Sequence, residues 1–104
     1  LMMAQGGTIN GKRVVPENFV NDIRDNAIDI GAPMQKYRNQ WWVYPGLNAF
    51  AARGVAGQTI MVVPDHDLVI VKLSSWPALS GYHSEGRVYD QRAMQAIVEY
   101  VKNL

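Results

Sequence analysis

Residues 58–73 read QTIMVVPDHDLVIVKL, and the expected fold class follows mainly from this stretch. Two runs rich in β-branched residues, 58–63 and 68–73, flank a polar group, 64–67, that contains proline, two aspartates and a histidine. Such runs, bounded by turn residues, are typical of strands. The short connection predicts an antiparallel hairpin, because a parallel crossover needs about a dozen residues or more. Both runs are nearly continuously hydrophobic, which predicts cover on both faces of the sheet.

The C-terminal segment is expected to supply this cover on one face. Its apolar residues recur at helical spacing, and Asp90 is suited to cap the helix. The expected stripe consists of Ala93, Met94, Ile97, Val98 and Val101. The predicted fold class is therefore α+β: antiparallel strands flanked by helices, with the C-terminal helix packed on the sheet.

Further strands are expected before the hairpin. Residues 40–44 (QWWVY) are bulky and aromatic, as strand residues often are. Trp41 and Trp42 alternate across this strand, so one ring is expected in the core and the other against a second layer or a cleft. Residues 50–53 lead into Gly54-Val55-Ala56-Gly57, whose glycines predict a bend or a close backbone approach.

The N-terminal third is expected to be mixed. Asn10-Gly11 lies between short β-branched stretches and predicts a tight turn. Pro16 is suited to a helix start, and an apolar stripe follows it at helical spacing. Residues 26–36, rich in Asp, Gly and Pro, are expected to form a loop. The helix stripe consists of Phe19, Val20 and Ile23.

The first residues favour the end of a helix. Residues 1–5 (LMMAQ) are strong helix formers, and Gly6-Gly7 is typical of a helix C-cap. We therefore expect the chain to begin inside a helix and to be a fragment. Its single domain, 1–104, is divided into 1–36 (helix, turn, short helix and loop), 37–75 (antiparallel strands) and 76–104 (loop and C-terminal helix).

Composition excludes several classes of protein. The chain has 104 residues, a formal net charge of +1 and no cysteine. The near-neutral charge excludes a strongly basic nucleic-acid module, and the lack of cysteine excludes a disulfide scaffold and a thiolate metal site. The longest aliphatic runs, 60–63 and 68–71, fall far short of the roughly 18 residues of a membrane helix. We expect no nucleic-acid partner, membrane span, metal or cofactor.

The polar groups offer few sites. Asp65-His66-Asp67 brings two carboxylates and an imidazole together, but consecutive turn residues seldom converge on one ion, and we interpret the run as a hairpin turn. His83 lies in a polar loop and is interpreted in the same way. A Ser-His-Asp triad could be drawn from Ser74, Ser75, His83 and Asp90. The sequence alone does not give the relative positions that such a triad requires.

The glycine pair leaves two interpretations open. Gly54-x-x-Gly57 is either a simple bend or a loop whose N–H groups point at a ligand. Oxyanion holes are commonly built from such backbone donors, because preorganised dipoles stabilise the charge that develops on a carbonyl oxygen.

Several runs come in a recognisable order. They are GG at 6–7, NGKRVVP at 10–16, YRNQWW at 37–42, G-x-x-G-Q at 54–58, and the strand pair that closes on SSWP at 74–77. From residue 1 to residue 77 this order resembles the C-terminal part of the serine β-lactamase-like hydrolases. That family includes class C β-lactamases, penicillin-binding carboxypeptidases, esterases and 6-aminohexanoate-dimer hydrolases. The runs at 37–42 and 72–77 look most like the oligomer-hydrolase branch.

The resemblance implies a mechanism and a site. In this family a serine, paired with a lysine one helical turn later, is acylated; a tyrosine assists proton transfer, and water hydrolyses the acyl-enzyme. The family's third motif, Lys-Thr-Gly in β-lactamases, falls on Ala52-Arg53-Gly54, which implies that the Val55 N–H completes the oxyanion hole. The substrate-binding positions that the resemblance implies are Arg53, Gly54, Ala56 and Gly57.

The chain departs from the family's pattern in this motif. Ala52 and Arg53 replace the family's lysine and hydroxyl residue, so β-lactams are not expected as substrates. Ala56 stands where esterases and oligomer hydrolases often have histidine. Arg53 is interpreted either as a partner for a substrate carboxylate or as a structural or solvated arginine.

The larger departure is the absence of the nucleophile. No Ser-x-x-Lys occurs in the 104 residues, and no Tyr-x-Asn stands where the second motif would. We expect the parent protein to be a serine hydrolase that cleaves amide or ester bonds in a small molecule. This chain would be its C-terminal sheet portion, inactive alone and partnered by the missing N-terminal portion of the fold.

Other interpretations stay open. The alternative function is a non-catalytic binding or interaction domain that retains the sheet. An uncovered sheet edge would favour a homo-oligomer. The sequence is compatible with a periplasmic, secreted or cytoplasmic location, with any targeting signal upstream.

Overall fold

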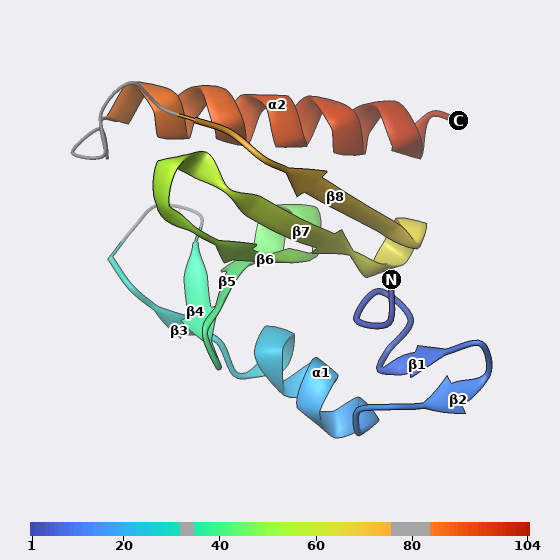
Figure 1. Cartoon of the computed structure of the whole chain (residues 1–104). Helices are drawn as coiled ribbons and strands as arrows, with labels where there is room; N and C mark the ends of the chain where they lie inside the picture. Colours follow the sequence, from blue (N-terminus) through green and yellow to red (C-terminus); the bar gives the residue numbers. More distant parts are fainter. Residues whose placement is uncertain (32–34, 76–83) are drawn as a thin grey trace.

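A computed structural model of the chain describes residues 1–31, 35–75 and 84–104. Within these ranges, six strands form an antiparallel sheet in which each strand pairs with the next along the chain (Figure 1). Its strands are β3 (Ile28–Asp29), β4 (Lys36–Arg38), β5 (Trp41–Tyr44), β6 (Ala49–Arg53), β7 (Thr59–Val63) and β8 (Leu68–Lys72). The remaining elements include the hairpin β1 (Thr8–Ile9) and β2 (Lys12–Arg13), helix α1 (Glu17–Asp25) and helix α2 (Ser84–Lys102). The predicted α+β class and the antiparallel hairpin over 58–73 are confirmed.

Two sheet turns share one chemistry. The 3-10 turns η1 (Pro45–Leu47) and η3 (Pro64–His66) each begin with proline, which presets φ, and each is followed by a residue in the left-handed region. These residues are Asn48 (φ 47°) and Asp67 (φ 48°), types that tolerate this conformation. The interpretation of 64–67 as a turn is confirmed, and Asp65 accepts a hydrogen bond of 2.8 Å from the Asn48 amide.

Helices lie on both faces of the sheet, but the cover predicted for the hairpin strands is incomplete, because Ile60 of β7 and Val71 of β8 are exposed. Helix α2 lies across one face, and helix α1 lies on the opposite side of the sheet (Figure 1). Trp41 and Trp42 divide between these faces: the Trp41 ring meets Phe50 edge-on at 5.1 Å in the α1-facing core, whereas Trp42 packs on the α2-facing core. The buried residues facing α2 are Tyr44, Ala49, Ala51, Met61 and Val63, and those facing α1 are Val43, Phe50 and Val62.

Helix α2 buries a narrower stripe than predicted. Met94 and Val98 are buried against the sheet and Val101 is half-buried, but Ala93 and Ile97 are exposed. The prediction was wrong for these two positions, because the part of the helix buried against the sheet follows the line of Met94, Val98 and Val101 and leaves Ala93 and Ile97 beside it. The prediction that Asp90 caps this helix was also wrong: Asp90 lies within α2, and its carboxylate pairs with Lys72 at 2.7 Å.

The N-terminal segment contains less helix and more strand than predicted. Residues 2–7 form a turn, in which the Gly7 N–H donates to the Met2 carbonyl at 3.0 Å and Gly6 adopts φ +69°. This is the glycine-capped geometry of a helix end, reduced to one turn. The Asn10-Gly11 turn between β1 and β2 is confirmed. The stretch 26–36, expected to be a loop, contributes strand β3 and the first residue of β4.

An ion pair anchors α1 to the sheet. Arg38 of β4 donates from Nε to a carboxylate oxygen of Asp22 at 3.0 Å, and the side chains of Asn26 and Asn39 donate to the same carboxylate. The hydrogen bond from Arg38 and those from the two asparagines hold the pKa of Asp22 below its usual value. Arg38 and Asn39 belong to the YRNQWW run, which is thereby explained in part by packing.

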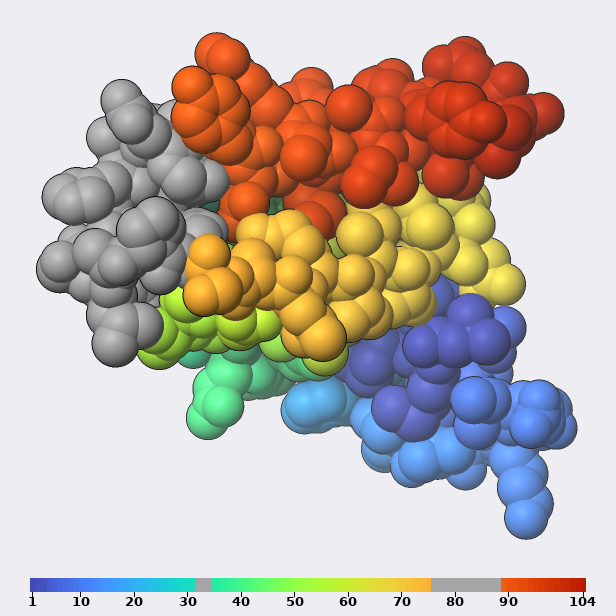
Figure 2. All heavy atoms as spheres, turned by 45° about the horizontal axis from the view of Figure 1, so that its top comes forward, coloured from blue at the N-terminus to red at the C-terminus, as the bar shows by residue number. Residues whose placement is uncertain are grey.

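Strand β8 lies at the edge of the sheet. Figure 2 shows it along one side of the molecule, between α2 and the N-terminal hairpin. Val71 and Leu73 are exposed there. No helix within the described ranges is long and apolar enough to cross a membrane.

Candidate functional site

The glycine pair forms the loop between β6 and β7. The Gly54 N–H donates to the Gln58 carbonyl at 2.8 Å and closes the hairpin beyond the Arg53–Thr59 pair. Between them lies the 3-10 turn η2 (Val55–Gly57), in which Ala56 (φ 60°) and Gly57 (φ 80°) are consecutive left-handed residues. For alanine this conformation costs about 1–2 kcal/mol, so the loop keeps a strained backbone.

Side chains behind the loop hold it in place. The Gln58 amide forms a two-point contact with the Ser74 backbone, accepting from its N–H at 3.2 Å and donating to its carbonyl. The Ser74 hydroxyl donates to the Ala56 carbonyl. Lys72 donates to the same hydroxyl at 3.2 Å and pairs with Asp90. A chain of polar contacts therefore connects helix α2, the end of β8 and the strained loop.

Val55 presents a backbone donor at the start of this loop. It is the first residue of the 3-10 turn, where an N–H has no acceptor inside the helix. No other acceptor bonds it within the described ranges, whereas the neighbouring Gly54 N–H is used by the hairpin. Val55 is 56% exposed. A fixed and unused N–H is the kind of group that stabilises charge on a carbonyl oxygen.

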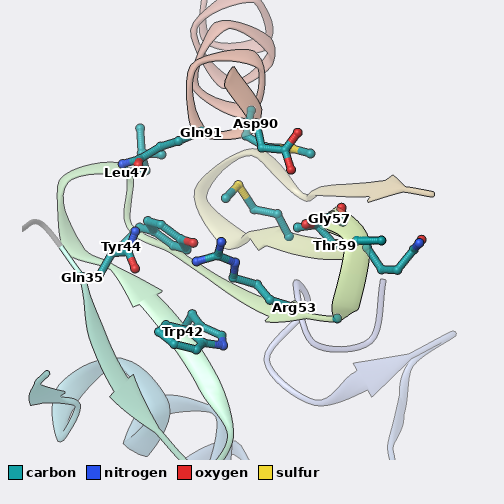
Figure 3. Close-up of a pocket in the computed structure, with 14 residues that line it drawn as sticks. Gln35, Trp42, Tyr44, Leu47, Arg53, Gly57, Thr59, Asp90 and Gln91 are labelled. Atoms are coloured by element: carbon teal, nitrogen blue, oxygen red, sulfur yellow. Dashed lines mark hydrogen bonds between the residues drawn. The ribbon is translucent and has the colours of Figure 1, made fainter. Parts of the chain in front are cut away.

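A pocket of about 220 Å³ lies beside the loop, between helix α2 and the sheet (Figure 3). Arg53 reaches into it, with its guanidinium 5.2 Å from the centre of the Trp42 ring. The apolar wall consists of Trp42, Tyr44, Leu47, Met61 and Met94. Polar groups come from Gln35, Thr59, Asp90 and Gln91, and the loop contributes Gly54, Ala56, Gly57 and Gln58.

The structure brings most of the predicted site residues together. Arg53, Gly54, Ala56 and Gly57 line one pocket, but Val55 is not part of its wall. Of the residues considered for a triad, Ser74 and Asp90 both contact Lys72, and His83 lies outside the described residues.

Sequence reasoning missed several pocket residues. Trp42 carried a signal, since strand alternation placed one tryptophan against a cleft, and Met94 stood in the helical stripe. Gln35 and Gln91 carried none, because tertiary packing brings the residue before β4 and a residue of α2 into one pocket.

The chain is similar in sequence and in fold to proteins that are named as hydrolases. No family model matches the chain. In sequence, the chain is 33% identical over 95 residues to the 6-aminohexanoate-dimer hydrolase of Paenarthrobacter ureafaciens, covering 82% of this chain and 24% of that protein. In structure, it matches a putative 6-aminohexanoate-dimer hydrolase from Bacillus anthracis with a TM-score of 0.73 and 30% identity, over 99% of this chain and 27% of that one.

These matches confirm the resemblance seen in the sequence. The chain is similar in sequence and in fold to hydrolases of the 6-aminohexanoate-dimer type. It spans about a quarter of the length of the two relatives.

Proposed function

We propose that this chain is the oxyanion-hole portion of a serine hydrolase that cleaves amide or ester bonds in small molecules through an acyl-enzyme. The observation that carries the proposal is the η2 loop, with a fixed Val55 N–H that no group in the described ranges uses. The similarity to two proteins named as hydrolases supports it. Arg53, Gly54, Ala56 and Gly57 are the proposed substrate-contacting residues.

The loop suits this chemistry because its geometry is set in advance. When a nucleophile attacks an amide or ester carbonyl, the oxygen gains negative charge, and donors about 2.7–3.1 Å away stabilise it. The contacts of Gln58 and Ser74 keep the loop from relaxing, so little reorganisation is needed during the reaction. In water-excluded surroundings such a donor lowers the barrier by several kcal/mol.

The nucleophile has to come from another segment. No Ser-x-x-Lys occurs among the 104 residues, so the acylated serine, its lysine and the assisting tyrosine lie elsewhere in the proposed enzyme. The exposed apolar surface over β6, β7 and β8 is the proposed contact for that segment. Ala52, Ile60 and Val71 stand opposite one another across these strands, and Leu73 adjoins them.

A chimera tests the proposal directly. In the chimera, residues 1–104 replace the matched segment of the Paenarthrobacter ureafaciens relative. Hydrolysis of 6-aminohexanoate dimer is then measured as product formation. We expect turnover, with a serine ester of the acyl group trapped by mass spectrometry after rapid acid quench. The 104-residue chain alone should hydrolyse nitrophenyl esters no faster than its denatured control.

Thermal unfolding separates the outcomes. A chimera that unfolds cooperatively and binds the dimer but forms no acyl-enzyme would contradict the proposal. It would favour the alternative, a non-catalytic binding or interaction domain. The presence of Ala52 and Arg53 in place of the family's lysine and hydroxyl residue also favours that alternative.

A further inference from the structure

The pocket under helix α2 is built around an arginine on a strand of small residues. Ala49 and Ala51 of β6 face α2 and are fully buried, and Arg53 continues the same face two residues later. Trp42 pairs with Ala51 across β5 and β6, so Arg53 is its diagonal neighbour. The alanines leave room between sheet and helix, and the guanidinium packs over the indole in that space.

Arg53 brings a cation to the pocket. Its guanidinium makes no ion pair or hydrogen bond within the described ranges, and the residue is half-buried. Asp90 is the acidic residue in the pocket wall, and it is already paired with Lys72 at 2.7 Å. Stacking on Trp42 uses the face of the guanidinium and leaves its edge donors available, and those donors match a carboxylate in two-point geometry.

The rest of the pocket is suited to a short aliphatic chain. Met61, Met94 and Leu47 supply apolar contacts in the same pocket as Arg53, and the methionines are flexible. With a volume of about 220 Å³, the pocket is below the roughly 300–1,000 Å³ of drug-sized sites and suits a small ligand. A carboxylate on about four carbons is such a ligand.

We propose that this pocket binds the carboxylate end of a small aliphatic molecule, with Arg53 pairing with the carboxylate and the chain packing on Met61 and Met94. Of the two interpretations of Arg53 that the sequence left open, the structure favours the ligand partner. The inference extends the proposed function, since Gly54, Ala56 and Gly57 belong to both the loop and the pocket, and the favoured substrates would then carry a free acid group.

Binding of pentanoate to the 104-residue chain tests this without any catalytic step, so its outcome is independent of the proposed hydrolysis. The readout is the NMR shift of the Arg53 Nε–H and the Trp42 indole N–H, with pentanamide as the neutral analogue of equal size. We expect saturable shifts with pentanoate and at least about tenfold weaker binding of pentanamide, the factor for roughly 1.4 kcal/mol.

Two substitutions make the test specific. Arg53→Gln should abolish the saturable shift of the Trp42 indole, and Arg53→Lys should weaken it, because lysine keeps the charge but loses the planar fork. Arg92→Gln, which removes an exposed arginine of α2, is the matched control and should bind like the parent chain.

The inference is overturned if pentanamide binds as well as pentanoate, or if Arg53→Gln binds pentanoate unchanged. Circular dichroism confirms that each variant is folded. If the chain unfolds on its own, the same titration in the hydrolase chimera gives the same decision.

Discussion

Gln58 holds the η2 loop of the candidate site in place, and removal of its side-chain amide should make the loop more mobile. Its side-chain amide contacts both the N–H and the carbonyl of Ser74, 16 residues away, and so ties the η2 loop to the end of β8. A Cβ on Gly54 would lie 3.1 Å from the Gln58 Cβ, which shows how closely the two ends of the loop approach. Gln58→Ala keeps this Cβ and removes both hydrogen bonds.

The expected loss of folding free energy in Gln58→Ala follows from those two hydrogen bonds. Each contributes about 0.5–1.5 kcal/mol net, so the pair contributes about 1–3 kcal/mol. Ser74 is half-buried, and water can reach its freed backbone groups, which favours the lower half of that range. For a domain of this size we expect Tm to fall by about 5–10 °C.

Thermal unfolding by circular dichroism measures the global effect, and amide exchange of Gly54 and Ser74, whose N–H groups are bonded to Gln58, measures the local one. We expect faster exchange at both amides in Gln58→Ala. Gln58→Glu, which keeps the acceptor for the Ser74 N–H but not the donor to its carbonyl, should lie between the two. Gln95→Ala, on the exposed side of α2, should leave both readouts unchanged. Unaltered Tm and exchange in Gln58→Ala would refute the idea that Gln58 fixes the loop.

The ion pair of Asp22 with Arg38 should make stability depend on acid pH. Because the folded-state pKa of Asp22 is lowered from 3.8, its contribution is present above that value and is lost as pH falls through the lowered pKa. Asp22→Asn should reduce the fall of Tm at acid pH. Asp25→Asn, at an exposed position of the same helix, is the control. The same dependence of Tm on acid pH in both variants would contradict a role of the ion pair. The exposed edge strand β8 should let the chain self-associate, so the sedimentation-equilibrium mass should rise above 11.6 kDa with concentration. Val71→Lys combined with Leu73→Lys should restore the monomer, since charges on an edge strand oppose pairing; a monomer of the unaltered chain at its solubility limit would show that the edge is protected.

Local sequence patterns predicted those parts of the fold that short-range chemistry determines. The hairpin over 58–73 follows from its β-branched runs and its proline-initiated turn, and the division of Trp41 from Trp42 follows from strand alternation. The helix end predicted for residues 1–5 is reduced to a turn, because so few residues form only one turn. The glycine cap nevertheless has the expected conformation.

Local sequence patterns could not predict the features that depend on tertiary packing. The five apolar residues of the C-terminal stripe all satisfy helical periodicity, and only contact with the sheet selects Met94 and Val98 and leaves Ile97 exposed. The same limit applies to the site. The glycine spacing indicated a loop, but the contacts of Gln58 with Ser74, and of Arg53 with Trp42, depend on strand register.

In the proposed mechanism the Val55 N–H stabilises the charge that develops during hydrolysis. Val55→Pro removes this N–H at the first position of a 3-10 turn, where proline is tolerated, and the ψ of 175° at Gly54 suits a following proline. Val55→Ala keeps the N–H and alters only an exposed side chain.

The decisive measurement is kcat of these two variants in the hydrolase chimera. We predict a loss of about 10²–10³ for Val55→Pro, with little change in Tm, and a kcat within a few-fold of the parent for Val55→Ala. Equal kcat values in two folded variants would contradict the placement of the oxyanion hole in this loop.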